Sequence, residues 1–320
     1  MRLGTAGRTI DGRRMTPTPE PSLHLRRTAI ADGWSDDELG RLVRAGGLER
    51  LRRGAYVAGT LPGDVAAVHR LLVHATLGCL RRPAVVSHQS AAVLHGLPLW
   101  DAPLDRVHVT REPNAWNHVS RVLRVHVAQL RDDEVTSVDG VAVTTPVRTA
   151  LDLARSLPHE AAVATLDAAL HRELLQPDDL RARLMDIVGT PGSRSAARAV
   201  AFADGRSESV GESRSRVILH RWGLTPSGLQ FEVLRRNGSS VGRTDFVWEE
   251  QRLVGEFDGR IKYGRLLRPG QTPGDAVFEE KRREDEIRDE GWGVIRWVWG
   301  ELAVPHRLAA RVRRALERPR

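Results

Sequence analysis

The most informative part of the sequence is the segment Gly242–Gly259, GRTDFVWEEQRLVGEFDG. Residues 243–248 and 253–257 contain most of its valine, leucine and aromatic side chains, and the four residues between these two runs are polar. Apolar runs separated by a short polar gap predict two antiparallel strands joined in a hairpin. Side chains on the same face of that hairpin therefore lie close together in space.

Three carboxylates occupy these two predicted strands. Asp245 lies on the first strand, and Glu256 and Asp258 lie two residues apart on the second, so that the latter two share a face. Antiparallel pairing can bring Asp245 opposite Glu256. Clustered carboxylates are costly unless a cation neutralises them, and Mg²⁺ prefers carboxylate and water ligands. We therefore expect these three residues to bind Mg²⁺, which activates water for phosphodiester cleavage. The alternative is a hairpin whose carboxylates face solvent.

Two further residues are candidates for the same site. Lys262 follows Asp258 by four residues, and its ammonium group is suited to orienting the attacking water or a phosphate oxygen. Glu212 lies on a predicted helix before the hairpin and would support the metal or hold a bound water. The predicted catalytic set is therefore Glu212, Asp245, Glu256, Asp258 and Lys262.

The elements around the hairpin complete an α/β pattern. A helix is predicted over 212–222 and a strand over 231–234 before it, and a charged helix over 278–290 and an apolar strand over 293–299 after it. A basic helix over 305–316 closes the chain.

The order of these features resembles the restriction-endonuclease (PD-(D/E)XK) core, and in particular its very-short-patch-repair endonuclease-like branch, DUF559. The residues that carry the resemblance are Glu212, Asp245, Glu256-Phe257-Asp258-Gly259, Asp285 and Gly291-Trp292-Gly293-Val294-Ile295-Arg296. The resemblance covers residues 207–302 and implies a metal-dependent nuclease domain. Two positions differ from the family pattern: Asp258 stands where the signature has a lysine, and Lys262 stands where the branch has a histidine.

The N-terminal part predicts a winged helix-turn-helix. Ser35 and Glu38 form a capping box at the start of a helix over 36–45, which ends at Gly46-Gly47. A helical segment precedes it, and residues 48–57 predict a hairpin. The predicted DNA-binding residues form a basic strip on the helix and the hairpin: Arg41, Arg44, Arg50, Arg52 and Arg53. In such a domain the helix enters the major groove and the hairpin arginines contact phosphates, although winged helices also bind proteins.

The same region resembles type IV AbiEi-family antitoxins. Leu25–Val57 is similar to their winged-helix domain, and Ser87–Leu97 and Thr145–Leu153 are similar to the segment that follows it. The resemblance implies binding to DNA and suggests a cognate toxin protein as a second partner.

Composition limits the class of protein. The 320 residues carry a formal net charge of +8, and 47 of the 49 basic residues are arginine, the only lysines being Lys262 and Lys281. The 41% hydrophobic content is typical of a folded soluble chain, and no apolar run is long enough to span a membrane. The single cysteine, Cys79, excludes an internal disulfide. We therefore expect a cytoplasmic protein with a nucleic-acid partner and no membrane association.

The sequence as a whole predicts a mixed α/β (α+β) protein. We expect a tail over 1–21, a winged helix-turn-helix over 22–60 and an antitoxin-like α/β region over 61–185. A linker over 186–206 then leads to a restriction-endonuclease-like α/β domain over 207–320.

Two functions follow from this organisation. The first is a DNA-binding protein with an Mg²⁺-dependent endonuclease domain. The alternative is a non-catalytic type IV antitoxin or transcriptional repressor with a degenerate nuclease domain. An antitoxin that binds only a toxin protein is a third possibility, which a neighbouring toxin gene would favour.

Overall fold

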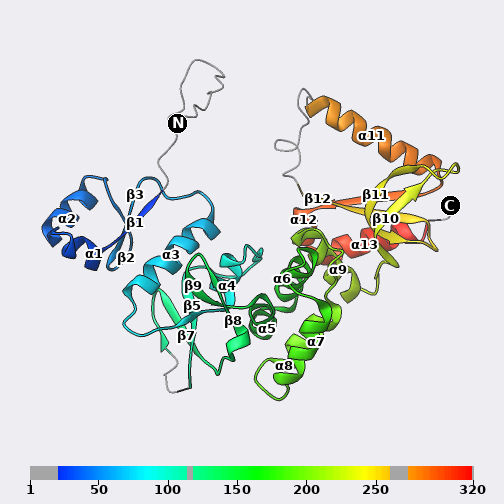
Figure 1. Cartoon of the computed structure of the whole chain (residues 1–320). Helices are drawn as coiled ribbons and strands as arrows, with labels where there is room; N and C mark the ends of the chain where they lie inside the picture. Colours follow the sequence, from blue (N-terminus) through cyan, green and yellow to red (C-terminus); the bar gives the residue numbers. More distant parts are fainter. Residues whose placement is uncertain (1–20, 114–117, 260–272, 319–320) are drawn as a thin grey trace, which may run out of the picture. The chain divides into compact units, whose positions relative to one another are not determined.

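The computed structural model describes residues 21–113, 118–259 and 273–318 (Figure 1). Its helices and its mixed or antiparallel sheets confirm the predicted α/β class. The chain divides into two compact units. The first comprises residues 1–84 and 104–127, and the second comprises residues 85–103 and 128–320.

The first unit begins with a small domain that has the predicted winged helix-turn-helix elements. Its elements are β1 (Ser22–Leu25), α1 (Arg26–Ala31), α2 (Asp36–Arg44), β2 (Glu49–Arg52) and β3 (Ala55–Ala58). The three strands form an antiparallel sheet in the order β1-β3-β2. The predicted hairpin over 48–57 is therefore confirmed as β2-β3. Leu39 and Ala29 from the two helices pack with Leu48 to form the core of this domain.

The helical segment predicted before α2 is preceded by a strand that was not predicted. Residues Ser22–Leu25 form β1, which pairs with β3 so that Leu23 lies opposite Val57 and Leu25 opposite Ala55. The alternation of Leu23 and Leu25 fits a strand equally well, and the partner strand lies more than 30 residues away. Only that non-local pairing selects the strand.

The remainder of the first unit is a long helix and three strands. Helix α3 (Val65–Cys79) is capped by Asp64, whose carboxylate accepts hydrogen bonds from the backbone N–H groups of Ala66 and Ala67. The strands are β5 (Val107–Arg111), β6 (His118–Val119) and β7 (Leu123–Val127). Strands β5 and β7 are parallel, and β6 is antiparallel to β7.

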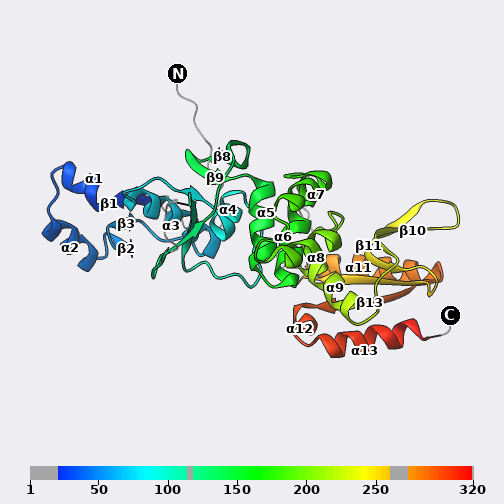
Figure 2. The ribbon, with the colours of Figure 1, turned by 90° about the horizontal axis from the view of Figure 1, so that it is seen from below.

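The second unit begins with short strands and a layer of helices. Its elements up to residue 202 are β4 (Val85–Val86), α4 (His88–Leu94), the 3₁₀ helix η1 (Asp132–Glu134), β8 (Val135–Val138), β9 (Val141–Thr144), α5 (Pro146–Ser156), α6 (His159–His171), α7 (Pro177–Asp186) and α8 (Ser193–Phe202). Figures 1 and 2 show α5, α6, α7 and α8 gathered in one bundle. The predicted linker over 186–206 contains α8, whose Ala196 and Ala199 are fully buried in the core of this bundle.

The second unit ends in a four-stranded sheet with helices on both faces. Its elements are α9 (Val210–Arg221), β10 (Gly228–Leu234), β11 (Ser240–Trp248), β12 (Leu253–Asp258), α11 (Pro273–Asp289), β13 (Gly293–Val298), α12 (Trp299–Leu302) and α13 (Pro305–Leu316). The strand order is β10-β11-β12-β13, antiparallel except for the parallel pair β12-β13.

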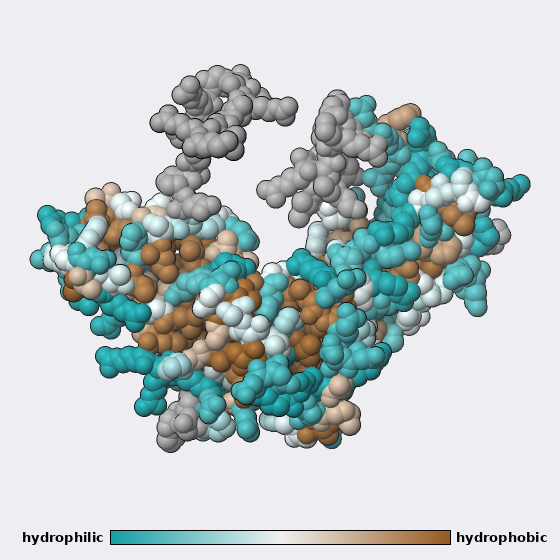
Figure 3. All heavy atoms as spheres, in the orientation of Figure 1, coloured by the Kyte–Doolittle hydropathy of each residue, from teal (hydrophilic) through white to brown (hydrophobic). Residues whose placement is uncertain are grey.

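Residues alternate between the two faces of this sheet. Phe246 and Trp248 pack with α9 and α13, whereas Val247 packs with Ile287 of α11. The ribbon shows α11 and α13 on opposite sides of the sheet (Figure 1). The outer surface of α11 is largely hydrophilic (Figure 3). The alternation therefore directs Asp245 and Glu256 to the face that α11 covers.

No helix within the described part of the chain is long and apolar enough to cross a membrane.

Candidate functional site

The second helix of the helix-turn-helix, α2, begins with the predicted capping box. The Ser35 hydroxyl accepts a hydrogen bond from the backbone N–H of Glu38 at 3.2 Å, and Glu38 accepts one from the backbone N–H of Ser35 at 2.8 Å. The Glu38 carboxylate accepts from the backbone N–H of Ser35 and also from its hydroxyl. These two hydrogen bonds, the backbone one first, lower the pKa of Glu38. Asp36 in the same turn pairs with Arg26 of α1, which fixes the angle at the start of α2.

The far end of α2 carries two exposed arginines. Arg41 and Arg44 are three residues apart on one side of the last turn, and the side chain of Arg41 is 69% exposed. The nearest carboxylate to Arg41 is that of Glu38, at 4.0 Å, which is too long for a strong ion pair. Both guanidinium groups are therefore available to an external anion.

The hairpin arginines differ in exposure. Arg50 and Arg53 are exposed, whereas Arg52 is half-buried and its Nε and Nη1 atoms are buried without a hydrogen-bond partner among the described residues. A bulge between Arg50 and Arg52 separates their side chains along β2. Arg50 and Arg53 are thus better placed than Arg52 to contact a ligand.

The predicted carboxylate site lies on the sheet of the second unit. Phe246 pairs with Gly255, so the next positions along the two strands, Asp245 and Glu256, face each other as predicted. The Asp245 carboxylate accepts a hydrogen bond from the backbone N–H of Phe257 at 2.7 Å. The strands therefore bring two of the predicted ligands together.

Both oxygens of Glu256 are already engaged by arginines. Its Oε1 lies 2.6 Å from Nη2 of Arg283 on α11, and its Oε2 lies 2.9 Å from Nε of Arg296 on β13. Nη1 of Arg296 also lies 2.9 Å from Oε1 of Glu280 on α11, so cationic and anionic groups alternate across this face of the sheet. Because Glu256 is only 8% exposed, these guanidinium groups supply the neutralisation that a metal ion would otherwise provide.

Glu212 is held as a buried carboxylate in the first turn of α9. It accepts hydrogen bonds from the Ser209 hydroxyl at 2.7 Å, the backbone N–H of Glu208 at 2.9 Å and the Gln230 side-chain amide at 2.9 Å. Gln230 reaches it from β10 with a left-handed backbone, φ 52°. These donors hold the Glu212 carboxylate beside Ser209, which is the N-cap of α9.

The remaining predicted site residues are less connected. Asp258 lies at the end of β12 and is half-buried, and Lys262 lies outside the described residues. Within the ranges that the structure describes, the ligand oxygens of Asp245, Glu256 and Asp258 do not form a group in which all lie within 4.8 Å of one another. A metal site would require these side chains to move.

A buried histidine pair in the first unit was not predicted. His108 on β5 and His126 on β7 approach within 3.1 Å, Nδ1 to Nε2, and their ring centroids are 5.1 Å apart. Burial, followed by the charges of His126 and Arg124, lowers the pKa of His108 to about 3, and burial and Arg124 lower that of His126 to about 4. The sequence signal is the position of each histidine in an alternating valine-rich strand.

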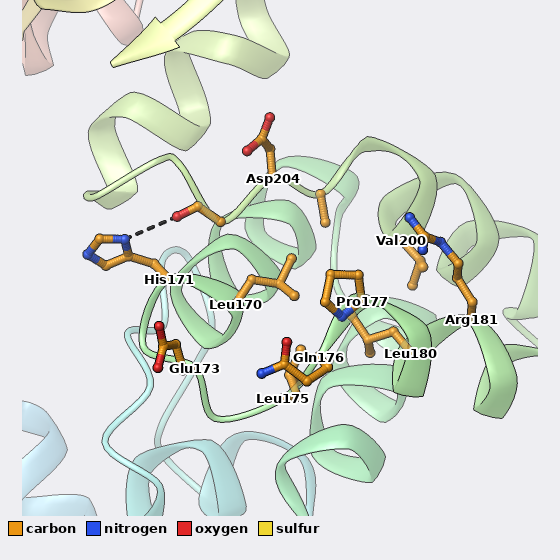
Figure 4. Close-up of a pocket in the computed structure, with 12 residues that line it drawn as sticks. Leu170, His171, Glu173, Leu175, Gln176, Pro177, Leu180, Arg181, Val200 and Asp204 are labelled. Carbon is orange, nitrogen blue, oxygen red and sulfur yellow. Dashed lines mark hydrogen bonds between the residues drawn. The ribbon is translucent and has the colours of Figure 1, made fainter. Parts of the chain in front are cut away.

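A cavity of about 620 Å³ opens between α6, α7 and α8 (Figure 4). Leu170, Pro177 and Leu180 form part of its wall, and His171 is bound to the backbone carbonyl of Gly205 at 3.1 Å. Its arginine, Arg181, pairs with the carboxylate of Asp178 at 2.7 Å. Two of its polar side chains, His171 and Arg181, are therefore engaged by neighbouring groups.

Two comparisons bear on the class of protein. Residues 76–201 match the AbiEi antitoxin C-terminal domain, which confirms that part of the predicted resemblance. The matched segment covers α4 to α7 and most of α8, and it follows the hairpin β2-β3 along the chain.

Two relatives share most of the chain. They are uncharacterized protein MT2308 of Mycobacterium tuberculosis strain CDC 1551 / Oshkosh and uncharacterized protein Rv2248 of strain ATCC 25618 / H37Rv. Each is 29% identical over 281 residues, which cover 87% of this chain and 96% of the relative. The similarity therefore extends well beyond the antitoxin-like segment.

Proposed function

We propose that this protein is a non-catalytic, DNA-binding regulator of the antitoxin kind. The observation that carries the proposal is the winged helix-turn-helix, with exposed arginines at the end of α2, preceding a segment that matches an antitoxin domain. In this role Arg41 and Arg44 would lie at the major groove, and Arg50 and Arg53 on the hairpin would contact phosphates. The half-buried Arg52 would contribute less.

The arginine contacts of Glu256 support a non-catalytic C-terminal domain. A nuclease needs its carboxylates free to bind a cation, and here Arg283 and Arg296 occupy both oxygens of the central one. In addition, Asp258 replaces the lysine of the signature. Both features favour a domain that has the sheet of a nuclease but holds its central carboxylate in ion pairs, where a nuclease would bind a metal ion.

The test is binding of the full-length protein to DNA from its own promoter, followed by fluorescence anisotropy. We expect specific binding that is lost in Arg41→Glu/Arg44→Glu and does not require Mg²⁺. Asp37→Asn serves as a control, because it changes the charge of an exposed side chain in the first turn of the same helix, away from the arginines. If the charge-reversal variant bound this DNA as tightly as the wild type, α2 would not be the helix that contacts DNA.

A second candidate function is Mg²⁺-dependent cleavage of DNA. The specific observation in its favour is that Asp245 and Glu256 face each other on adjacent strands, with β13 parallel to β12. Asp245, Glu256 and Asp258 would bind the ion, with Lys262 and Glu212 in supporting roles. In this case Asp245→Asn, whose amide oxygen can still accept from the backbone N–H of Phe257, would abolish Mg²⁺-dependent nicking of plasmid DNA. Nicking that persists in this variant would exclude these carboxylates.

A cognate toxin protein is a further proposed partner, suggested by the antitoxin match. Coexpression with the product of an adjacent gene tests it. Relief of growth arrest by the wild type and by Arg41→Glu/Arg44→Glu alike would separate neutralisation of a toxin from DNA binding.

A further inference from the structure

An aromatic and basic cluster lies where three helices of the second unit meet. The ring of Phe202, at the end of α8, is 5.8 Å from the ring of His159 on α6 and 5.0 Å from that of His220 on α9. Both histidine rings are tilted against the phenylalanine, by 60° and 54°. The Phe202 ring of α8 therefore contacts histidine rings from two other helices.

Two arginines add charge to this group. Arg198 lies one helical turn before Phe202 on α8, and Arg221 follows His220 at the end of α9. Burial and then the charges of Arg198, Arg221 and His220 lower the pKa of His159. These five residues therefore form one neighbourhood, named here the Phe202 cluster: His159, Arg198, Phe202, His220 and Arg221.

Among the described residues, no carboxylate forms an ion pair with either arginine of the Phe202 cluster. The one carboxylate that acts on His159 is that of Glu160, and its Oε1 is bound by Nε of Arg214 at 2.6 Å. Arg198 and Arg221 are both exposed, and neither forms an ion pair with a carboxylate of the described ranges. Arg198 only donates a 3.3 Å hydrogen bond to the Ser195 hydroxyl.

The adjoining surface has the same character. Trp222 follows Arg221 and is 39% exposed, and its carbonyl oxygen accepts a hydrogen bond from Nη2 of Arg313 on α13 at 3.3 Å. Arg313 is exposed as well. Arg221, Arg313 and the exposed indole of Trp222 therefore lie near the ends of α9 and α13.

We propose that the Phe202 cluster binds the phosphate backbone of DNA, as a contact surface additional to the winged helix. Arginine presents a planar fork of donors that fits phosphate oxygens. The choice of DNA rests on the proposed function, whereas the contact itself is carried by residues of the second unit. Within the described ranges the two arginines Arg198 and Arg221 lack a carboxylate partner, although Arg198 donates to the Ser195 hydroxyl. Contacts with phosphate add affinity that is independent of base sequence.

The experiment measures binding of full-length protein to a labelled duplex of arbitrary sequence over a range of NaCl concentrations. We expect Arg198→Glu/Arg221→Glu to weaken binding about tenfold or more at low salt. The slope of log affinity against log salt should fall by about 2, because each phosphate contact contributes about 0.9. Arg198→Gln/Arg221→Gln should also weaken binding, but by a smaller factor. This variant tests the proposal even if charge reversal impairs folding.

The matched control is Arg236→Glu/Arg282→Glu, which makes the same change in net charge at two exposed arginines of the second unit. A fall in slope no larger than that of the control would overturn the proposal. The proposal would also be overturned if poly-glutamate competed as well as DNA at equal charge, because the Phe202 cluster would then be a site for an acidic protein. Arg41→Glu/Arg44→Glu should lose sequence preference yet keep the contribution of the cluster, so the two proposals fail separately.

Discussion

The clearest case of a residue whose chemistry depends on its surroundings is Glu256. The sequence places it beside Asp245 and Asp258, and the sheet does bring Asp245 and Glu256 face to face. The sequence does not reveal that Arg283 and Arg296, 27 and 40 residues further along, take up its two oxygens. An ion pair of low exposure depends on which helix covers the sheet face, and strand patterns do not encode that.

The buried histidines predict a pH dependence of stability. The folded pKa values of His108 and His126, about 3 and about 4, are below the ordinary value of 6.5. Below pH 6.5 the unfolded chain therefore binds more protons than the folded chain. The contribution of the two histidines to the free energy of unfolding is fully present above that pH and falls as the pH decreases. At pH 5 each histidine costs about 2 kcal/mol, from about 1.4 kcal/mol per pH unit.

Thermal unfolding between pH 7.5 and pH 5 measures this loss. We expect His108→Gln/His126→Gln to have a flatter pH profile than the wild type, whatever its stability at pH 7.5. His24→Gln is the control, because His24 lies on β1 at the other end of the first unit's fold and keeps both buried rings. A profile unchanged by the double substitution would show that other groups cause the pH dependence.

At the scale of elements, local signals located most helices and strands. The capping box of α2, the hairpin β2-β3 and the final helix over Pro305–Leu316 follow from residues that are adjacent in the chain. Strand β1 did not follow, because its partner β3 is distant in sequence. Elements defined by their own caps are predictable, whereas an element defined by a remote strand is not.

Close packing of α9 on the sheet predicts the effect of one substitution. A Cβ atom at Gly211 would lie 1.9 Å from Cε1 of Phe257 on β12, so Gly211→Ala forces the helix and strand apart. We expect a destabilisation of about 1–3 kcal/mol or more, typical of overpacking. Gly300→Ala is the matched control, because no atom lies within 4 Å of its added Cβ. Urea denaturation of both variants measures the difference, and equal midpoints would contradict this packing.

At the scale of the molecule, α9 links the helical bundle to the sheet within the second unit. Val217 packs in the core of the bundle, and Ile218 and Leu219 pack in the core of the sheet. Arg216 of the same helix forms a buried ion pair with Asp167 of α6 at 2.8 Å. One helix therefore contributes to both cores.

This arrangement predicts that the bundle and the sheet lose stability together. Arg216→Leu leaves the Asp167 carboxylate buried without its partner, at a cost of about 3–5 kcal/mol. Native-state hydrogen exchange should then show similar reductions in opening free energy for peptides of α6 and of β13. Arg194→Leu, at an exposed position, should leave both unchanged. A reduction confined to α6 would mean that the bundle and the sheet open independently.

The sequence by itself determined the α/β class, the capped helix α2 with the hairpin β2-β3, and the facing carboxylates of β11 and β12. These depend on caps, alternation and turns, which act between near neighbours in the chain. Only the tertiary structure decided the partners of Glu256, the pairing of His108 with His126 and the meeting of three helices at Phe202. The reason is physical: burial, desolvation and ion pairing depend on which distant residues come into contact, and that is set by the packing of whole elements.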